Sequence, residues 1–146
     1  MYHDILIPTD GSKDARKAVE HGIDLAEAFD ATVHALYVVE SRLVTIPSGS
    51  MRQADERDDW VEYGREITEE VSVEAERRGL SSTTAVESGK AHEEIVEYAD
   101  RNGIDCIVMG THGRDGVEDV ILGSVAERVV RTANAPVTTV RRSKLE

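Results

Sequence analysis

The sequence predicts an α/β protein built on a doubly wound sheet of five parallel strands, with helices on both faces. Short apolar runs of strand length alternate along the chain with longer segments whose apolar residues recur at helical spacing. Such alternation is typical of parallel strands joined by right-handed helical crossovers. The first apolar run, Ile5-Leu-Ile7, favours a central strand buried on both sides. We expect the strand order 3-2-1-4-5, within one domain of 146 residues.

Strands and helices follow one another in order. The apolar runs place strands at residues 2–8, 32–39, 83–86, 105–109 and 136–141. The helical spacing of apolar residues places helices at residues 15–29, 60–79, 94–102 and 124–133. Turn residues and caps occupy the junctions, as in Thr9-Asp-Gly-Ser12 after the first strand and Gly103 after the third helix. Pro47-Ser-Gly-Ser50 interrupts the periodicity and is predicted to be a loop.

The fourth strand and the helix that follows it have the clearest signals. Asp105-Cys-Ile-Val-Met109 is short, apolar and bounded by Asp and Gly, which favours a buried strand over a helix. From Ser124 onward, apolar residues recur at helical spacing with charged residues between them. Ser124 is therefore the predicted N-cap, because a Ser hydroxyl accepts a hydrogen bond from a free backbone N–H at a helix start.

Glycines are concentrated between this strand and this helix. Gly110-Thr-His-Gly113 is followed after nine residues by Gly123-Ser124-Val125. Such a loop can bind phosphate, because glycine lets oxygens approach the backbone and the helix dipole attracts an anion. Ordinary turn and cap chemistry is the commoner explanation, and spacing alone leaves both open.

The predicted architecture also fixes where a ligand would bind. In doubly wound sheets, ligands bind beyond the carboxyl ends of the strands, where the strand order reverses. With the first strand central, the loop at Thr9-Asp10 and the loop at Gly110 face each other across that crevice. Two loops far apart in the sequence are thus predicted to line one pocket.

Composition excludes several classes of partner and location. The net charge of −12 disfavours nucleic acid and anionic membranes, because both reward clustered Lys and Arg. No apolar run approaches the roughly 18 residues of a membrane span, and the N-terminus lacks a signal-peptide pattern, so we expect a cytoplasmic protein. Cys106 lies within an apolar strand and is predicted to be buried. The acidic balance, with four Lys among 17 basic residues, suggests adaptation to high intracellular salt.

Several separated segments together resemble the universal stress protein family. They are Ile5-Leu-Ile-Pro-Thr-Asp-Gly-Ser12, Ala35-Leu-Tyr-Val-Val39, Val108-Met-Gly-Thr-His-Gly113, Ile121-Leu-Gly-Ser-Val-Ala-Glu-Arg-Val129 and Ala135-Pro-Val137. The glycine pattern with its following Ser is similar to that of the ATP-binding branch. The resemblance covers nearly the whole chain and implies one universal stress protein domain over residues 1–146, with an adenine nucleotide alpha hydrolase-like fold. Residues 43–59 match no family pattern.

The resemblance implies that the adenosine of a bound ATP lies between the first, second and fourth strands. Pro8 and Thr9 would shape the floor of the pocket, and Asp10 would lie near the adenosine. The backbone of Val38, at the end of the second strand, would meet the adenine edge.

The resemblance also implies where the ribose and the phosphates would bind. Met109 and Gly110 would lie near adenine and ribose. Backbone amides would be offered to the phosphates by Gly113, Gly123, Ser124 and Val125. Ser124 would add its hydroxyl. A Mg²⁺ ion bridging phosphate oxygens is expected, since it keeps several waters and needs few protein ligands.

Alternatives stand beside these roles. Asp10 could be only a cap of the first helix. His112 could act as an acid or base, but with no paired carboxylate visible nearby it is predicted to be an exposed loop histidine. Lys13 and Arg114 would either neutralise phosphate charge or remain solvated surface residues.

Other site chemistries lack their residues. The chain contains no Gly-x-Ser-x-Gly nucleophile motif and no Gly-x-x-x-x-Gly-Lys-Ser/Thr phosphate loop. Its five histidines include no His-x-x-x-His pair, and one cysteine cannot build a structural zinc site. A flavodoxin-like anion loop at residues 9–12 is allowed, but it leaves the second glycine cluster unexplained. No catalytic residue and no protein metal ligand is predicted.

The last strand predicts a partner. Pro136 lacks an N–H, which suits an edge position, and residues 137–140 would leave a row of unpaired backbone groups. Proteins of the resembled family commonly dimerise through this strand, so we expect a twofold homodimer. The predicted function is that of an ATP-binding stress protein, acting as a nucleotide-dependent regulatory or protective module. The alternatives are a slow ATPase or nucleotidyl-transfer enzyme of the same fold, and a dimeric scaffold that binds no nucleotide.

Overall fold

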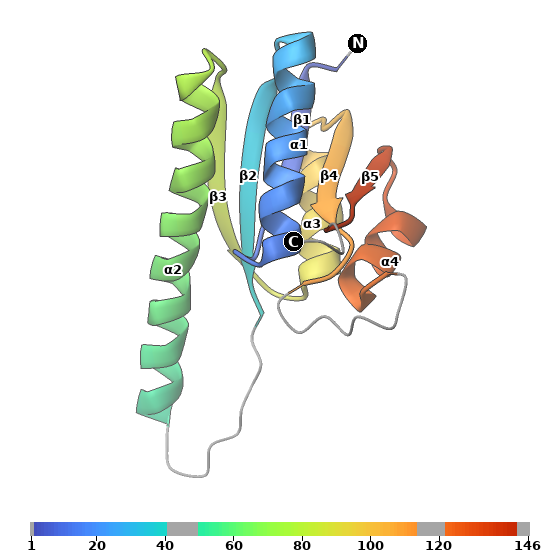
Figure 1. Cartoon of the computed structure of the whole chain (residues 1–146). Helices are drawn as coiled ribbons and strands as arrows, with labels where there is room; N and C mark the ends of the chain where they lie inside the picture. The colour runs from blue at the N-terminus through green and yellow to red at the C-terminus, as the bar shows by residue number, and fades with distance from the viewer. Residues whose placement is uncertain (1, 41–49, 114–121, 143–146) are drawn as a thin grey trace.

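The computed structural model describes residues 2–40, 50–113 and 122–142, and for residues 50–57 it describes the backbone alone. Strands and helices alternate along these residues (Figure 1). They are β1 (Asp4–Pro8), α1 (Lys13–Phe29), β2 (Thr32–Val39), α2 (Ser50–Arg77), β3 (Ser82–Ser88), α3 (Ala91–Arg101), β4 (Cys106–Gly110), α4 (Ser124–Thr132) and β5 (Val137–Val140).

The strands form one parallel sheet in the order β3-β2-β1-β4-β5, which confirms the predicted class and strand order. β1 is central, and its residues Ile5, Leu6 and Ile7 are fully buried. The chain leaves β1 toward β2 on one side, and it later crosses to β4 on the other side. The reversal of strand order therefore falls between β1 and β4, where doubly wound sheets bind ligands.

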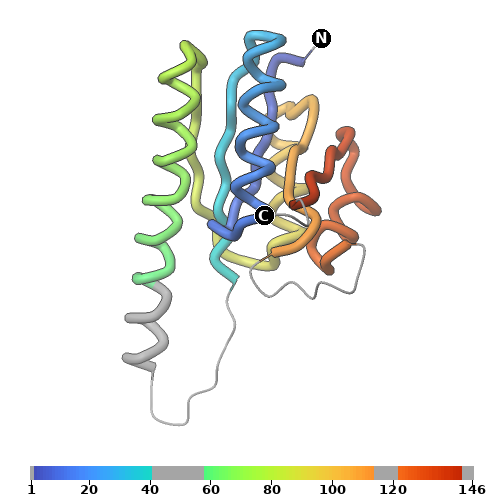
Figure 2. Tube along the Cα trace, in the orientation of Figure 1, coloured from blue at the N-terminus to red at the C-terminus, as the bar shows by residue number. Residues whose placement is uncertain are grey.

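The helices cover both faces of the sheet, as predicted. α1 and α2 pack against one face, where Ile7 of β1 meets Ile23 of α1 and Val71 of α2 in one buried cluster. α3 and α4 pack against the other face, around Leu6 and Ile107. Figures 1 and 2 show α1 in front of the sheet and α3 behind it. Burial of apolar side chains on both faces of β1 is the main stabilising contribution to this arrangement.

Element boundaries differ from the sequence prediction where the residues are polar. α2 begins at Ser50, well before the predicted start at Trp60. The prediction missed its first turns because their apolar residues do not recur at helical spacing. Ser50 therefore belongs to a helix and not to the predicted loop, whose other residues, 47–49, lie outside the described residues. β3 covers residues 82–88 instead of 83–86, since the pairing with β2 extends the strand beyond its apolar positions.

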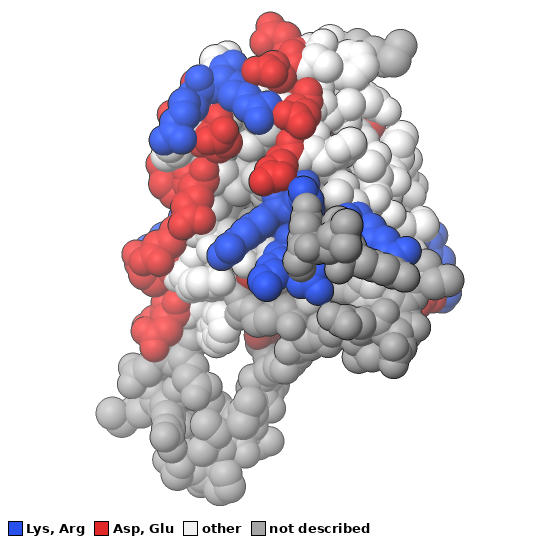
Figure 3. All heavy atoms as spheres, viewed as in Figure 1, with Lys and Arg blue, Asp and Glu red and all other residues white. Residues whose placement is uncertain are grey.

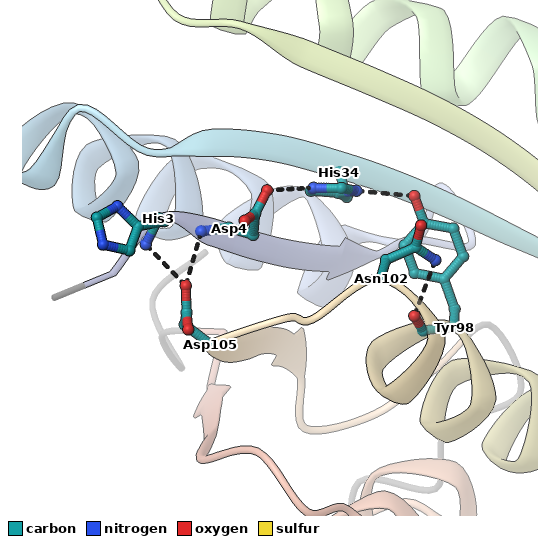
Figure 4. A network of polar contacts seen from close by, with 6 residues as sticks. All are labelled: His3, Asp4, His34, Tyr98, Asn102 and Asp105. Carbon is teal, nitrogen blue, oxygen red and sulfur yellow. Dashed lines mark hydrogen bonds and ion pairs between the residues drawn. The ribbon is translucent and has the colours of Figure 1, made fainter.

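A polar network ties the amino end of the sheet together (Figure 4). Oδ2 of Asp105 accepts the backbone N–H groups of His3 (2.7 Å) and Asp4 (2.9 Å), and these two bonds hold the pKa of Asp105 below its ordinary value. His34 bridges Oδ1 of Asp4 (2.9 Å) and the hydroxyl of Tyr98 (2.8 Å). Because a carboxylate only accepts, Nε2 of His34 carries the proton, and in the neutral ring Nδ1 accepts from Tyr98.

Two further findings bear on the composition of the chain. Cys106 in β4 is 1 % exposed, which confirms the predicted burial, and that burial raises the pKa of its thiol. Among the residues that the structure describes, no helix is both long enough and apolar enough to cross a membrane.

Candidate functional site

The carboxyl ends of β1 and β4 bring the two predicted loops into contact. The strands are paired neighbours, with Ile5 opposite Cys106. A Cβ atom placed on Gly113 would lie 2.9 Å from Oδ2 of Asp10. The loop after β1 and the loop after β4 therefore touch across the crevice, and a larger residue at position 113 would displace that carboxylate.

The loop after β1 is a hydrogen-bonded turn. Thr9 is 7 % exposed and donates its N–H to the carbonyl of Leu36 at 2.9 Å. Its Oγ1 accepts the N–H of Gly11 at 3.2 Å. Oδ1 of Asp10 accepts the N–H of Ser12 at 2.9 Å, and Ser12 is the N-cap of α1. Asp10 thus shapes the turn before the helix, with its other carboxylate oxygen on the side of Gly113.

The loop after β4 is closed by backbone contacts between its two glycine clusters. Thr111 donates its N–H to the carbonyl of Val140 at 3.1 Å, and its own carbonyl accepts the N–H of Gly123 at 2.7 Å. A Cβ atom on Gly123 would lie 3.2 Å from that same carbonyl oxygen. Glycine at position 123 therefore lets the start of α4 approach the end of β4.

The start of α4 corrects one expectation. Gly123, with φ −69° and ψ 165°, is the N-cap, and its carbonyl accepts the N–H of Glu127, so the prediction of Ser124 as N-cap is wrong. In this structure the N–H of Gly123 is donated to the carbonyl of Thr111. Ser124, Val125 and Ala126 open the helix, and their N–H groups have no acceptor within it. A helix start of this kind favours an anion through its amides and the helix dipole.

The predicted adenosine contacts lie at the same end of the sheet. Pro8 is buried at the end of β1, opposite Leu36. Val38 is half-buried near the end of β2, and Met109 is 6 % exposed in β4. The side chains of Val38 and Met109 pack into the core beneath α3 and α4. Any contact they make with a ligand at this end therefore falls mainly to their backbones.

A charged cluster beside the loop was missed by sequence reasoning. Asp14, in the first turn of α1, has Oδ2 at 3.5 Å from Nδ1 of His112 and Oδ1 at 3.9 Å from Nε of Arg142. The side chains of Asp14 and His112 are 13 % and 17 % exposed. The prediction of an exposed His112 without a nearby carboxylate is therefore wrong. Nothing in local spacing could have found this pair, because the sheet brings together residues almost a hundred positions apart.

The charge is unevenly distributed over the surface. Figure 3 shows acidic side chains along α2 and basic side chains gathered around the lower end of α1. Lys13 is exposed at the first residue of α1, while Arg114 lies outside the described residues. Local positive charge on a strongly acidic chain favours the binding of an anion at this end.

A hollow of about 190 Å³ lies beside the loop after β1 but opens between α1 and α2. Its lining residues are Thr9, Gly11, Arg16, Val19, Tyr63, Ile67, Glu70 and Val71. It is smaller than the roughly 300 Å³ at which ligand pockets begin. In the described part of the chain, no three His, Cys, Asp or Glu side chains gather as metal ligands would.

Comparison with known proteins gives a consistent result. Residues 1–141 match the profile of the universal stress protein family. The universal stress protein MJ0531 of Methanocaldococcus jannaschii is 43 % identical over 148 aligned residues, which cover 100 % of this chain and 86 % of that protein. The solved structure of protein MJ0577 of the same organism has a TM-score of 0.85 at 33 % identity, covering 99 % of both chains. The universal stress protein UspA of Lactobacillus plantarum has a TM-score of 0.88 at 25 % identity, covering 96 % of this chain and 98 % of its own.

Two more distant structures hold nucleotides. A universal stress protein of Archaeoglobus fulgidus, with a TM-score of 0.65 at 18 % identity, was solved in complex with dAMP and is covered to 98 % by 95 % of this chain. Another universal stress protein, with a TM-score of 0.70 at 21 % identity, was solved in complex with cAMP and is covered to 99 % by 97 % of this chain. At these identities the likeness concerns the fold.

Proposed function

This chain belongs to the universal stress protein family, and from that premise we propose that it binds ATP and acts as a nucleotide-dependent regulatory or protective module. The proposal includes one universal stress protein domain over residues 1–146 and a cytoplasmic location. A fast enzymatic turnover is not part of it.

The observation that carries the proposal is the meeting of glycine backbone and helix amides at the reversal of strand order. Gly113 lies against the carboxylate of Asp10, and Gly123 lies against the backbone of Thr111, where a Cβ atom would come within 2.9 Å and 3.2 Å of an oxygen atom, respectively. Beside them α4 opens with N–H groups that have no acceptor within the helix. This combination suits a phosphate chain, because backbone donors approach its oxygens and the helix dipole favours its charge.

In the proposed complex, the phosphates bind the amides of Gly113, Ser124 and Val125 and the hydroxyl of Ser124. A Mg²⁺ ion would bridge phosphate oxygens and keep most of its waters, so it requires few protein ligands. Gly123 is proposed to belong to the same phosphate site; its N–H is bonded to Thr111 in this structure, and glycine at this position lets the start of α4 approach the end of β4.

The adenosine is proposed to lie toward β2, where Pro8 and Thr9 form the floor. Asp10 would meet the ribose, the backbone of Val38 would meet the adenine edge, and Met109 and Gly110 would flank the base and sugar. The complexes of two distant relatives with dAMP and cAMP support an adenine nucleotide as the ligand class.

Calorimetric titration with Mg-ATP in high potassium chloride tests the proposal. We expect micromolar binding by the wild type and about 100-fold weaker binding by Gly123→Val, since the branched side chain would push the loop off the carbonyl of Thr111. Gly103→Ala is the matched control. It adds strain at φ 61° in the turn before β4, at the other end of the sheet, and leaves the crevice intact.

A folded wild type that gives no heat, no displacement of a fluorescent ATP analogue and no copurified nucleotide would contradict the proposal. That result would favour a dimeric scaffold that binds no nucleotide.

Slow hydrolysis is the second candidate, and the pairing of His112 with Asp14 is the observation that favours it. Steady multiple turnover of ATP, abolished by Asp10→Ala or His112→Asn and retained by Gly103→Ala, would establish it. Turnover that follows a contaminant through purification, at equal rates in all variants, would dismiss it.

We also propose a homodimer through β5. Every residue of β5 is half-buried in the single chain, and Val130 of the neighbouring α4 is 48 % exposed. Pairing of two β5 strands would cover both features. Light scattering at micromolar concentration is expected to give twice the mass of 16.1 kDa, and a monomeric mass would refute the dimer.

A further inference from the structure

The carboxylate of Asp14 has no role in the contacts proposed for ATP, yet it contacts the loop after β4, which is proposed to bind the phosphates. We call residues 111–113 of that loop the phosphate loop. Its Oδ2 accepts the hydroxyl of Thr111 at 3.1 Å and lies 3.5 Å from Nδ1 of His112. Its Oδ1 lies 3.9 Å from Nε of Arg142, which follows β5. One side chain of α1 thus reaches both the loop after β4 and the segment after β5.

The backbone of Asp14 takes part in the same contact. A Cβ atom on Gly110 would lie 2.9 Å from the carbonyl carbon of Asp14 and 3.0 Å from its carbonyl oxygen. The backbone of Asp14 therefore lies close to Gly110, and its side chain is hydrogen-bonded to Thr111. Asp14 is itself fixed, because Ser12 caps the turn of α1 in which it lies.

Electrostatics alone does not explain a carboxylate at this place. A negative charge beside an anion site opposes phosphate binding. Interaction with the dipole of α1 accounts for an acidic residue in the first turn, but not for its hydrogen bond with Thr111. The guanidinium of Arg142, with Nε 3.9 Å from Oδ1 of Asp14, partly offsets this negative charge.

We propose that Asp14 is a positioning residue of the phosphate loop: by holding Thr111 and His112, it sets the backbone direction that presents Gly113 to the ligand. This inference rests on the proposed ATP site. It assigns Asp14 no contact with the nucleotide itself.

The test compares Mg-ATP with adenosine, because adenosine lacks the phosphates that the loop would bind. Asp14→Ala is expected to weaken Mg-ATP about tenfold and to leave adenosine within about twofold. Asp14→Asn keeps an oxygen for the hydroxyl of Thr111 and should restore ATP affinity to within about threefold. Glu20→Gln is the control, since it removes one charge from the exposed side of α1, where the Glu20 side chain is 69 % exposed.

A second variant tests the contact itself. Thr111→Val keeps the shape of the side chain and removes the hydroxyl. The same hydroxyl also contacts Nδ1 of His112 at 3.1 Å. The double variant Asp14→Ala/Thr111→Val is expected to lose less Mg-ATP affinity than the sum of the two single losses, because both changes delete the bond between Asp14 and Thr111. If Asp14→Ala does not fold, Thr111→Val and Asp14→Asn carry the same comparison of ATP with adenosine.

Tighter ATP binding by both Asp14 variants would overturn the inference, because the carboxylate would then act only by repelling phosphate. Equal losses for ATP and adenosine would also overturn it.

A measurement without ligand separates this inference from the proposed function. Hydrogen exchange of the Thr111 amide, which is bonded to Val140, should be at least about tenfold faster in Asp14→Ala than in Glu20→Gln. Faster exchange supports the positioning role even if the wild type binds no ATP. An unchanged exchange rate refutes the positioning role even if the wild type binds ATP.

Discussion

The two ends of the sheet carry similar polar residues and use them differently. At the amino end, both ring nitrogens of His34 have side-chain partners at 2.8 and 2.9 Å, and Asp105 binds two backbone N–H groups. At the carboxyl end, Asp14 and His112 each contact the hydroxyl of Thr111 at 3.1 Å, but the contacts of Asp14 with His112 and Arg142 are longer, at 3.5 and 3.9 Å. The amides that open α4 have no acceptor within their helix.

This difference separates a structural network from a candidate binding site. At the amino end, each donor of the network meets an acceptor of the fold, so the network contributes stability. At the carboxyl end, glycines bring the backbone to the surface of the crevice and a helix begins there. A cluster of ionisable residues therefore indicates a ligand site when backbone N–H groups without an acceptor in the fold lie next to it. The network at the amino end does not meet this condition.

The largest expected effect comes from breaking the amino-end network. His34→Ala should lower the free energy of unfolding by about 3 kcal/mol, because it leaves a cavity and removes the hydrogen bonds of the buried ring with Asp4 and Tyr98. Tyr98→Phe, which removes one bond of the same chain, should cost about 1 kcal/mol. Urea unfolding measures both. Mg-ATP affinity should stay within about twofold of wild type, and a selective loss of affinity in either variant would break the comparison.

Asp105 gives a smaller effect with a defined dependence on pH. Its folded pKa lies below the ordinary value because His3 and Asp4 donate to the carboxylate. The stabilisation is present above the unfolded pKa of about 3.9 and is lost as the pH falls through the lower folded value. Asp105→Asn should therefore cost about 1 kcal/mol at pH 7, with the difference shrinking below about pH 4. A deficit that persists undiminished in acid would show that the charge is not its cause.

The smallest expected effect on stability is a gain, and it comes from Glu94 at the carboxyl end of the sheet, outside the proposed site. Burial raises the pKa of Glu94 in the first turn of α3, and nearby acidic side chains, first Glu97 and Glu87, raise it further. A raised folded pKa disfavours the ionised form, so Glu94 destabilises the fold above that pKa and not below the unfolded value of about 4.3.

Glu94→Gln should therefore raise the free energy of unfolding at pH 7 by less than about 1 kcal/mol, with no gain in acid. ATP affinity should not change. Exposed Glu93 is the matched control, because no comparable gain is expected from Glu93→Gln in the same turn. An equal gain from both variants would assign the effect to net charge.

The sequence predicts the sheet well because strand burial leaves a local pattern. Ile5, Leu6 and Ile7 form an unbroken apolar run, and that run identified the central strand. The pattern fails where the residues are polar. The first turns of α2 and the ends of β3 carry no apolar period, and tertiary pairing decides their extent.

The candidate site was only partly predictable. The glycine pattern located the loop, but Gly123 and Ser124 are both good N-cap residues, and choosing between them requires the closure of Gly123 onto Thr111. The pairing of Asp14 with His112 left no local signal, because only the pairing of β1 with β4 and the packing of α1 against β4 bring them together.

The most direct test of the difference between the two ends is a nitrogen-15 NMR titration of the wild type with Mg-ATP in high potassium chloride. We predict the largest amide shift changes at residues 9–12, 111–113 and 124–126, with residues 3–4, 34 and 98–105 unaffected. Changes concentrated at the amino end, or around the hollow between α1 and α2, would contradict the assignment of the nucleotide to the carboxyl end.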